Sequence, residues 1–255
     1  MSILLSGDFH INASNELFTI LKTELIKKYG KEKYDGIKYH IILGDAGFLW
    51  PGNAIEEIRI FNTLKERPFP VLCVLGNHDP VLGRNDLQEI DIGIGEKVIV
   101  IKNENPFIAY LKRGKIYTIE GKRFLVLGGA LSIDKEYRIP GLSWWKEEYW
   151  SKPEEKSLFK LLKRENNFDY VLSHTGPNRI NETIFKSINK VGLSPVFFDE
   201  VAALNEKIDC KISCKQWFCG HWHKDYFYYC DNQKRGYQYL YRKTALLTDN
   251  MIEVL

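Results

Sequence analysis

The chain has 255 residues, a formal net charge of +3 at neutral pH, and 44% hydrophobic residues. A globular chain of this length buries roughly 70–75% of its unfolded surface, and the composition excludes a disordered chain, a collagen-like repeat and a small disulfide scaffold. The balance of 36 basic against 33 acidic residues argues against a broad basic coat for nucleic acid, although a local basic patch is compatible with it.

The first third of the chain alternates between strand and helix patterns. Short apolar runs predict strands at Ile3–Ser6, His40–Leu43 and Val71–Leu75. Between them, residues 14–29 and 54–65 carry apolar side chains at the i, i+3, i+4 spacing of amphipathic helices. This order predicts a parallel sheet that is covered on both faces.

From about residue 98 the pattern changes to short strands joined by tight turns. We expect strands at Val98–Ile101, Phe107–Leu111, Ile116–Glu120, Arg123–Leu127, Tyr170–Ser173, Gln216–Cys219 and Thr244–Leu247, and in the alternating segment around Tyr237, Tyr239 and Tyr241. Helices are predicted over 153–165 and 200–207. We therefore expect an α/β fold in which a second, mainly antiparallel sheet packs on the first. This is a two-sheet β-sandwich flanked by helices, within a single domain over residues 1–255.

The sequence also bears on location and redox state. The N-terminus lacks a basic segment followed by an apolar core, and no run of about 18 apolar residues occurs, so neither a signal peptide nor a membrane span is predicted. An odd count of five cysteines predicts reduced thiols and a cytoplasmic protein. Four of them lie between Cys210 and Cys230 without the close CxxC pairs of a zinc site, so we expect buried or half-buried thiols there.

Polar side chains follow five of the predicted strands. They are Asp8-Phe9-His10, Asp45, Asn77-His78-Asp79, His174 and His221-Trp222-His223, and four of the five groups directly follow a glycine. In sheets of this class, function lies beyond the carboxyl ends of the strands. Residues i and i+2 of an extended chain point the same way, so we expect Asp8 to converge with His10, and His221 with His223.

Seven of these residues offer nitrogen or oxygen ligands. A set of carboxylate, imidazole and amide groups without thiolate suits Mn²⁺, Fe or Zn²⁺. Seven donors exceed the four of one tetrahedral site, but they suffice for two ions if one carboxylate bridges them. Two neighbouring metal ions form the clamp used in phosphoryl hydrolysis.

The motifs resemble those of the calcineurin-like metallophosphoesterase superfamily. Its DxH, GD, GNH followed by an acidic residue, lone His and GHxH motifs match Asp8-Phe9-His10, Gly44-Asp45, Gly76-Asn77-His78-Asp79, His174 and Gly220-His221-Trp222-His223 in the correct order. The segment 128–138 is similar to one found in small bacterial and phage members of undefined substrate. The resemblance therefore spans residues 8–223 and implies the calcineurin-like phosphoesterase fold.

The resemblance also implies a division of labour among the ligands. Asp8, His10 and His223 would hold one metal ion, Asn77, His174 and His221 the other, and Asp45 would bridge them. Two divalent or trivalent ions are implied, with Mn²⁺ as the first choice and Fe or Zn²⁺ as alternatives.

The implied reaction is metal-dependent hydrolysis of a phosphomono- or phosphodiester. A hydroxide bridging the metals would attack phosphorus, and His78 would act as the general acid at the leaving oxygen. Asp79 would orient His78.

Differences from better-known members of the superfamily narrow the class of substrate that we expect. Leu75 replaces the Arg that precedes GNH in the Ser/Thr protein phosphatases, and Ala46-Gly47-Phe48 replaces their Asp-Arg-Gly segment. The 32 positions after His223 are too few for the capping domain of the repair nucleases. We therefore expect a small phosphorylated or nucleotide-like substrate, with short nucleic acid as an alternative and no membrane. The choice among monoester, diester and pyrophosphate stays open, as does the oligomeric state.

Substrate-binding residues are expected in the loops. Lys135 or Arg138 could bind the phosphate, although both could equally be solvated loop charges, and Trp50, Arg84 and Arg179 are further candidates. The aromatic segments Tyr226–Tyr229 and Trp144-Trp145 could stack a base, but packing in the core is the simpler role.

Two alternatives complete the sequence-based view. His40 belongs to none of the motifs, so we expect it to be structural. The whole chain could also be a non-catalytic binding or scaffold protein on the same fold. Such descendants usually lose a ligand or the GNH histidine, and this chain retains them all.

Overall fold

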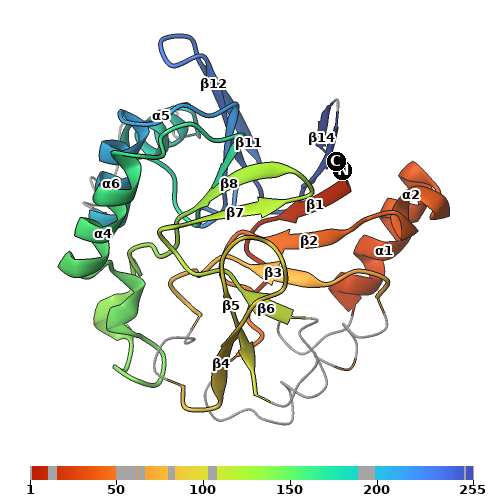
Figure 1. The fold of residues 1–255 in the computed structure, drawn as a ribbon, viewed down its shortest axis with the longest axis horizontal. Helices are drawn as coiled ribbons and strands as arrows, with labels where there is room; N and C mark the ends of the chain where they lie inside the picture. The colour runs from red at the N-terminus through yellow and green to blue at the C-terminus, as the bar shows by residue number, and fades with distance from the viewer. Residues whose placement is uncertain are drawn as a thin grey trace.

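The computed structural model describes residues 2–10, 16–49, 62, 67–79, 84–102, 108–188, 199–249 and 251–254, and of residues 16–21 and 188 it describes the backbone only. Two mixed β-sheets pack face to face, with helices on both outer sides (Figure 1). The predicted α/β sandwich is confirmed. Trp50 and, except for residue 62, the helix predicted over 54–65 lie outside the described residues.

The first sheet has eight strands in the order β14-β13-β1-β2-β3-β6-β5-β4. They are β1 (Ser2–Ser6), β2 (Tyr39–Ile42), β3 (Val71–Cys73), β4 (Leu87–Ile90), β5 (Val98–Ile101), β6 (Ile108–Tyr110), β13 (Thr244–Thr248) and β14 (Ile252–Val254). The central strands β1, β2, β3 and β6 run parallel, as the apolar runs predicted for the first three. The other strands pair antiparallel at both sides.

The second sheet has six strands in the order β11-β12-β10-β9-β8-β7. They are β7 (Lys115–Ile119), β8 (Lys122–Val126), β9 (Tyr170–Leu172), β10 (Gln216–Cys219), β11 (Tyr226–Cys230) and β12 (Arg235–Tyr239). The expectation of a mainly antiparallel sheet was wrong, because β8, β9, β10 and β12 are parallel to one another. Helices connect β8 to β9 and β9 to β10, and such crossovers return the chain in the same direction. Strands β5, β6 and β13, expected in this sheet, belong to the first.

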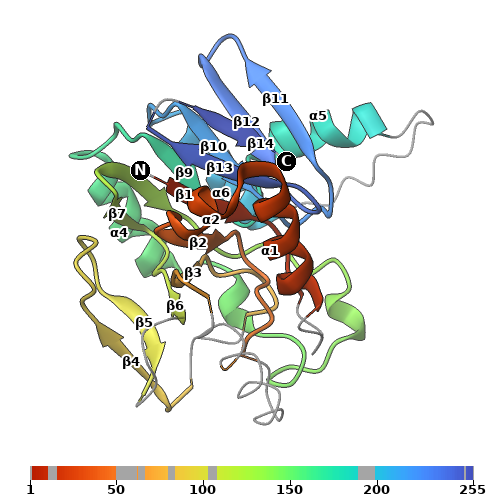
Figure 2. The ribbon, with the colours of Figure 1, turned by 90° about the vertical axis from the view of Figure 1, so that its right-hand side faces the viewer.

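Helices cover the outer face of each sheet (Figure 2). Against the second sheet lie α4 (Lys152–Leu162), α5 (Asn178–Ile188) and α6 (Glu200–Asp209), which bury Leu158, Ile184 and Leu204. Against the first lie α1 (Glu16–Tyr29) and α2 (Lys31–Asp35), where Leu25 and Tyr34 pack with residues of β1 and β13. Helices α2 and α5 were not predicted, nor were strands β4, β11 and β14.

The inner faces of the two sheets form the main core. Leu5 and Leu43 of the first sheet pack with Phe124, Leu172 and Phe218 of the second, all fully buried. Each such side chain contributes about 1.5–3 kcal/mol of hydrophobic stabilisation. This packing fixes how the strand ends of the two sheets meet, which matters for the site below.

Two further predictions concern cysteines and membranes. All five cysteines are free thiols; four are buried, while Cys210 is exposed and not buried or half-buried as expected. Among the helices that the structure describes, none is both long and apolar enough to cross a bilayer.

Candidate metal centre

The candidate ligands lie where strands end and loops begin. Asp8 and His10 follow β1, Asp45 follows β2, Asn77 follows β3, His174 follows β9, and His221 and His223 follow β10. Among the described residues, two groups place their ligand atoms within 4.8 Å of one another: Asp8, His10 and His223, and Asp8, Asp45 and His174. The packed sheets thus gather side chains from the ends of four strands at one end of the sandwich.

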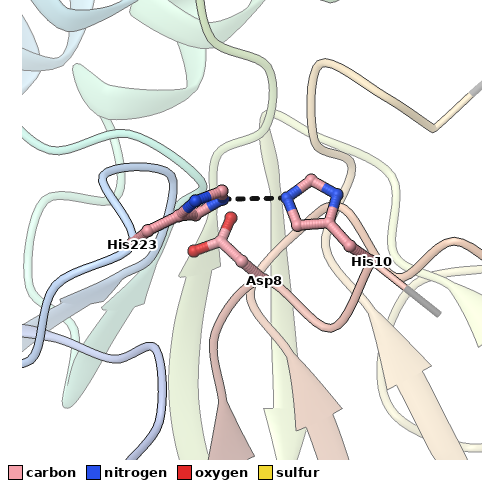
Figure 3. A group of neighbouring side chains, drawn as sticks. All are labelled: Asp8, His10 and His223. Carbon is pink, nitrogen blue, oxygen red and sulfur yellow. Dashed lines mark hydrogen bonds between the residues drawn. The ribbon is translucent and has the colours of Figure 1, made fainter. Parts of the chain in front are cut away.

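The first group is held by loops after β1 and β10. The rings of His10 and His223 point a nitrogen at each other beside the Asp8 carboxylate (Figure 3), and their Nε2 atoms are 2.9 Å apart. Oδ2 of Asp45 lies 3.7 Å from Nε2 of His10. Imidazole nitrogens and carboxylate oxygens therefore converge on one point, a mixed set that suits a divalent metal ion.

His174 is the centre of the second group. Its Nδ1 donates to the Leu43 carbonyl over 2.7 Å. This bond directs Nε2 at Asp45 Oδ2, 3.2 Å away, and at Asn77 Oδ1, 3.0 Å away. If the ring is neutral, its one hydrogen is on Nδ1, and the lone pair of Nε2 faces two oxygens that also carry lone pairs. A proton or a metal ion must therefore lie between Nε2 and these oxygens. Burial by itself lowers the pKa of His174, but the Asp45 carboxylate raises it to about 10.

Buried polar atoms without hydrogen-bond partners give a second sign that this site fits a cation. Both carboxylate oxygens of Asp8 and Nε2 of His221 are buried and make no hydrogen bond with the described residues. Leaving such atoms unpaired costs about 1–3 kcal/mol each, and burial raises the pKa of Asp8 to about 7. Metal ions would satisfy all three atoms, so the residues present fit the two ions that the sequence predicted.

The backbone at the site is in an uncommon conformation. His10, Asp45, His221 and His223 have φ values of 38°, 49°, 71° and 49°. Left-handed backbone is costly outside glycine and collects at functional sites. The expected convergence of Asp8 with His10 is confirmed, but the extended backbone expected for the two i, i+2 pairs was wrong. The chain turns after each strand, so His223 meets His10, while the ring of His221 lies against His174 with centroids 4.9 Å apart.

Asp79 ties the loops after β2 and β3 together. Its Oδ2 accepts from the backbone N–H of Asp45 at 2.9 Å and of Gly76 at 2.8 Å. In return, Asp45 Oδ1 accepts from the N–H of His78 at 2.8 Å. Asp79 thus positions the candidate bridging carboxylate through the backbone. The role predicted for it in orienting the His78 ring stays a prediction.

Glycine before the ligands allows close approach. A Cβ on Gly44 would lie 2.2 Å from Nδ1 of His174, and one on Gly76 would lie 2.1 Å from Oδ1 of Asp45. Only glycine leaves room for the side chains to pack against these turns.

Arg138 reaches the candidate acid, His78. Its Nη2 lies 3.4 Å from Nε2 of His78. The guanidinium is held by Asp134 at 2.6 and 2.7 Å and by the Ser143 carbonyl at 3.0 Å. Burial and the charge of Arg138 lower the pKa of His78, whereas Asp45 opposes them. Of the two cations proposed for phosphate, Arg138 is the one beside His78. Lys135 lies over the Trp144 ring, 4.3 Å from its centroid.

The other candidates from the sequence lie in local contacts. Arg84 pairs with Asp86. Arg179 forms ion pairs with Glu206 and Asp209. His40 is fully buried and bonds Ser6 and Arg67, in keeping with the structural role expected for it.

The aromatic residues considered for base stacking at 226–229 alternate between buried and exposed positions. Tyr226 and Tyr228 pack against the core between the second sheet and its helices, whereas Phe227 and Tyr229 are exposed. Trp144 donates to Glu148 and lies near Tyr149.

Three residues at the site, Tyr241, Asp225 and Ser132, were not predicted to belong to it. Tyr241 stacks on His223, with ring centroids 4.7 Å apart and planes 13° from parallel. Asp225 accepts from the N–H of Tyr241 at 2.9 Å, which fixes the loop that carries this ring. Ser132 accepts from Asn77 Nδ2 at 3.0 Å. These residues lie outside the five motifs, and no local pattern marks them.

The chain was compared with known families and proteins. A family model described as calcineurin-like phosphoesterase matches residues 1–225. No curated protein matches the sequence.

Solved structures with a similar arrangement share little sequence. A dimetal phosphatase from Danio rerio is 11% identical with a TM-score of 0.49, the match covering 100% of this chain and 95% of that one. Phosphopantetheinyl hydrolase from Mycobacterium tuberculosis is 11% identical with a TM-score of 0.47, over 94% of this chain and 89% of that one. GAP50, the anchor in the inner membrane complex of Plasmodium, is 9% identical with a TM-score of 0.49, over 100% of this chain and 83% of that one.

Proposed function

The chain belongs to the calcineurin-like phosphoesterase family, and from this premise we propose that it hydrolyses phosphomono- or phosphodiester bonds of a small or nucleotide-like substrate. The observation that supports this most is the convergence of ligand atoms from Asp8, His10, Asp45, His174 and His223 within two overlapping groups. The buried Asp8 carboxylate, whose oxygens make no hydrogen bond with the described residues, belongs to both groups.

We assign the ligands in two sets. Asp8, His10 and His223 would hold one ion, and Asn77, His174 and His221 the other, with Asp45 between them. When bound, the two ions lower the pKa of water and neutralise charge on the phosphoryl oxygens. Mn²⁺ is the ion we propose first, with Fe or Zn²⁺ as alternatives, because nitrogen and oxygen ligands discriminate weakly among them.

His78 is the proposed general acid. Its backbone N–H is anchored to Asp45 and its Nε2 faces Arg138. The pKa of His78 is lowered in the free chain, so proton donation requires a group that favours the imidazolium. An anionic phosphoryl group bound beside His78 and Arg138 would offset the charge of the guanidinium and favour that form.

Arg138 is the proposed phosphate-binding residue. Its fork of donors matches phosphoryl oxygens, and Asp134 and Ser143 hold it in place before substrate arrives. A preorganised cation loses little conformational entropy on binding.

The substrate class can be tested with a panel of esters. Metal-free protein would be loaded with Mn²⁺ and given an aryl phosphate, an aryl phosphodiester, nucleotides, cyclic nucleotides and short oligonucleotides. We expect at least one class to be cleaved. A folded, metal-loaded chain that cleaves none of them would refute the proposal.

Two substitutions test the roles of the residues. Asp8→Asn should reduce metal occupancy, because it removes charge from both ligand groups. His78→Ala should leave the metal bound and lower kcat by about 10²–10⁴-fold, the usual contribution of a general acid. Full activity in both variants would overturn these roles.

A further inference from the structure

The side chain of Asn77 can serve a metal in only one of its two orientations. An amide binds metals through oxygen, while its NH₂ group only donates hydrogen bonds. In the structure Oδ1 faces Nε2 of His174 at 3.0 Å, and Nδ2 faces Oγ of Ser132 at 3.0 Å. Some neighbour must hold the amide in this orientation, because the flipped amide has nearly the same shape.

Ser132 and Glu148 together select the orientation. The Ser132 hydroxyl lies 2.5 Å from Oε2 of Glu148. Burial raises the pKa of Glu148, whereas the donors of Ser132 and Trp144 oppose this shift. The ionised carboxylate only accepts, so in that form the single hydroxyl hydrogen points at Glu148. The oxygen of Ser132 is then left as an acceptor, and the group of Asn77 that faces it must be the NH₂. Oδ1 is thereby turned toward the metal side.

Glu148 is itself held from three directions. Its Oε1 accepts from Nε1 of Trp144 at 2.7 Å. Arg113 donates to the backbone carbonyls on both sides of Glu148, at Glu147 over 2.8 Å and at Tyr149 over 2.9 Å. The residue is only 3% exposed. A buried carboxylate whose hydrogen-bond donors are all neutral is costly, so its position calls for a role beyond stability.

We propose that Glu148 is a positioning residue that, through Ser132, fixes the amide of Asn77 with its oxygen toward the second metal ion. The inference rests on the proposed function, since it takes Asn77 as a ligand. The loop between β8 and α4 then carries both Glu148, which orients this ligand, and Arg138, which lies beside His78.

The conservative variant Glu148→Gln makes the sharpest test. Trp144 still donates, so it would hold the oxygen of the new amide and turn the new NH₂ toward Ser132. Ser132 would then accept from residue 148 and give its hydrogen to Asn77. The hydrogen-bond chain would run in reverse, and Asn77 would present NH₂ to the metal.

The measurement is calorimetric titration of Mn²⁺ alone into the metal-free full-length chain. Glu148→Gln and Ser132→Ala should each weaken binding of one of the two ions by about 10–100-fold, as expected when a partner of a ligand is lost. The exposed neighbour serves as the matched control, and Glu147→Gln should bind as the wild type does. Thermal unfolding of each metal-free variant verifies that it is folded.

A rescue separates orientation from a general loss of structure. A carboxylate presents oxygen on both sides, so Asn77→Asp needs no orientation. Adding Glu148→Gln to Asn77→Asp should cost no further Mn²⁺ affinity. Wild-type Mn²⁺ affinity in a folded Glu148→Gln chain would overturn the inference. It would also be overturned if Glu148→Gln lowered the Mn²⁺ affinity of Asn77→Asp as much as it lowers that of the wild type.

Because this readout is binding and not turnover, the inference can fail while the proposed function stands. A wild-type chain that binds Mn²⁺ but cleaves no ester would overturn the proposed function alone. A wild-type chain that binds no Mn²⁺ would overturn both.

Discussion

Nε2 of His174 lies 3.2 Å from Oδ2 of Asp45, and both side chains are at most 3% exposed. The other nitrogen of the ring is committed to the Leu43 carbonyl. The contact between His174 and Asp45 is therefore favourable only with a cation between the two atoms, a proton in the metal-free chain or a metal ion in the loaded one.

This contact predicts a pH dependence of the metal-free chain. The folded pKa of His174 is raised to about 10 from 6.5. The protonated His174 ring thus stabilises the folded chain fully below pH 6.5, and this stabilisation is lost as the pH rises toward 10. Between pH 6.5 and 8.5, the free energy of unfolding should fall by up to about 1.4 kcal/mol per pH unit. Urea unfolding in a chelator would measure this slope, and His174→Gln should flatten it. An equal slope in both proteins would contradict the assignment.

Gly44→Ala should disrupt the site. The new Cβ would lie 2.2 Å from Nδ1 of His174, on backbone with φ of 88°. Gly121 offers a control, because its φ is 73° and a Cβ added there would have no described atom within 4 Å. Gly121→Ala should cost about 1–2 kcal/mol from left-handed backbone alone. Gly44→Ala should cost more and abolish binding of Mn²⁺. Equal losses in unfolding free energy would show that crowding at His174 is unimportant.

Tyr241 should stabilise the position of the His223 ring. Stacked aromatic pairs contribute about 0.5–1.5 kcal/mol, so Tyr241→Ala should weaken Mn²⁺ binding by up to about tenfold. Tyr241→Phe keeps the ring and should bind as the wild type does. Calorimetry on the metal-free proteins distinguishes them. If the Phe variant binds as weakly as the Ala variant, the phenol group and not the stacked ring is responsible.

Arg138→Ala should raise KM for a cleaved ester by about 10–100-fold, the effect of losing a charged hydrogen bond of about 1.5–3 kcal/mol. Metal binding should not change. Lys135→Ala is the matched control from the same loop, because Lys135 lies over Trp144, and its KM should stay near the wild-type value. Steady-state kinetics would decide, and a larger effect at Lys135 would reverse the assignment.

Much of the site could be predicted because its chemistry is local in sequence. Asp8, Asp45 and Asn77 directly follow apolar runs and glycines, so the strand end and the ligand appear side by side. The parallel order of β1, β2 and β3 follows from the helical segments expected between them. Glu148 and Tyr241 could not be predicted, since each reaches the site by tertiary contacts from a distant loop.

The errors have physical causes as well. Short strands carry no signal of direction, so the second sheet was expected to be antiparallel although helices were predicted before β9 and before β10. The left-handed φ of His10 and His223 was missed because only glycine adopts such backbone routinely; histidine, like asparagine and aspartate, adopts it more often than other residues but still in a small minority of cases. These residues are held there by the surrounding site rather than by their own preference.

The central claim is that the side chains at the strand ends hold two metal ions which make the chain a phosphoesterase. The most direct measurement titrates Mn²⁺ into the metal-free protein while bound metal and hydrolysis of an ester from the panel are followed together. We predict no turnover without metal and a rate that saturates as the second ion binds. Turnover that is unaffected by chelation, or a chain that saturates with Mn²⁺ and stays inactive on every ester tested, would contradict the claim.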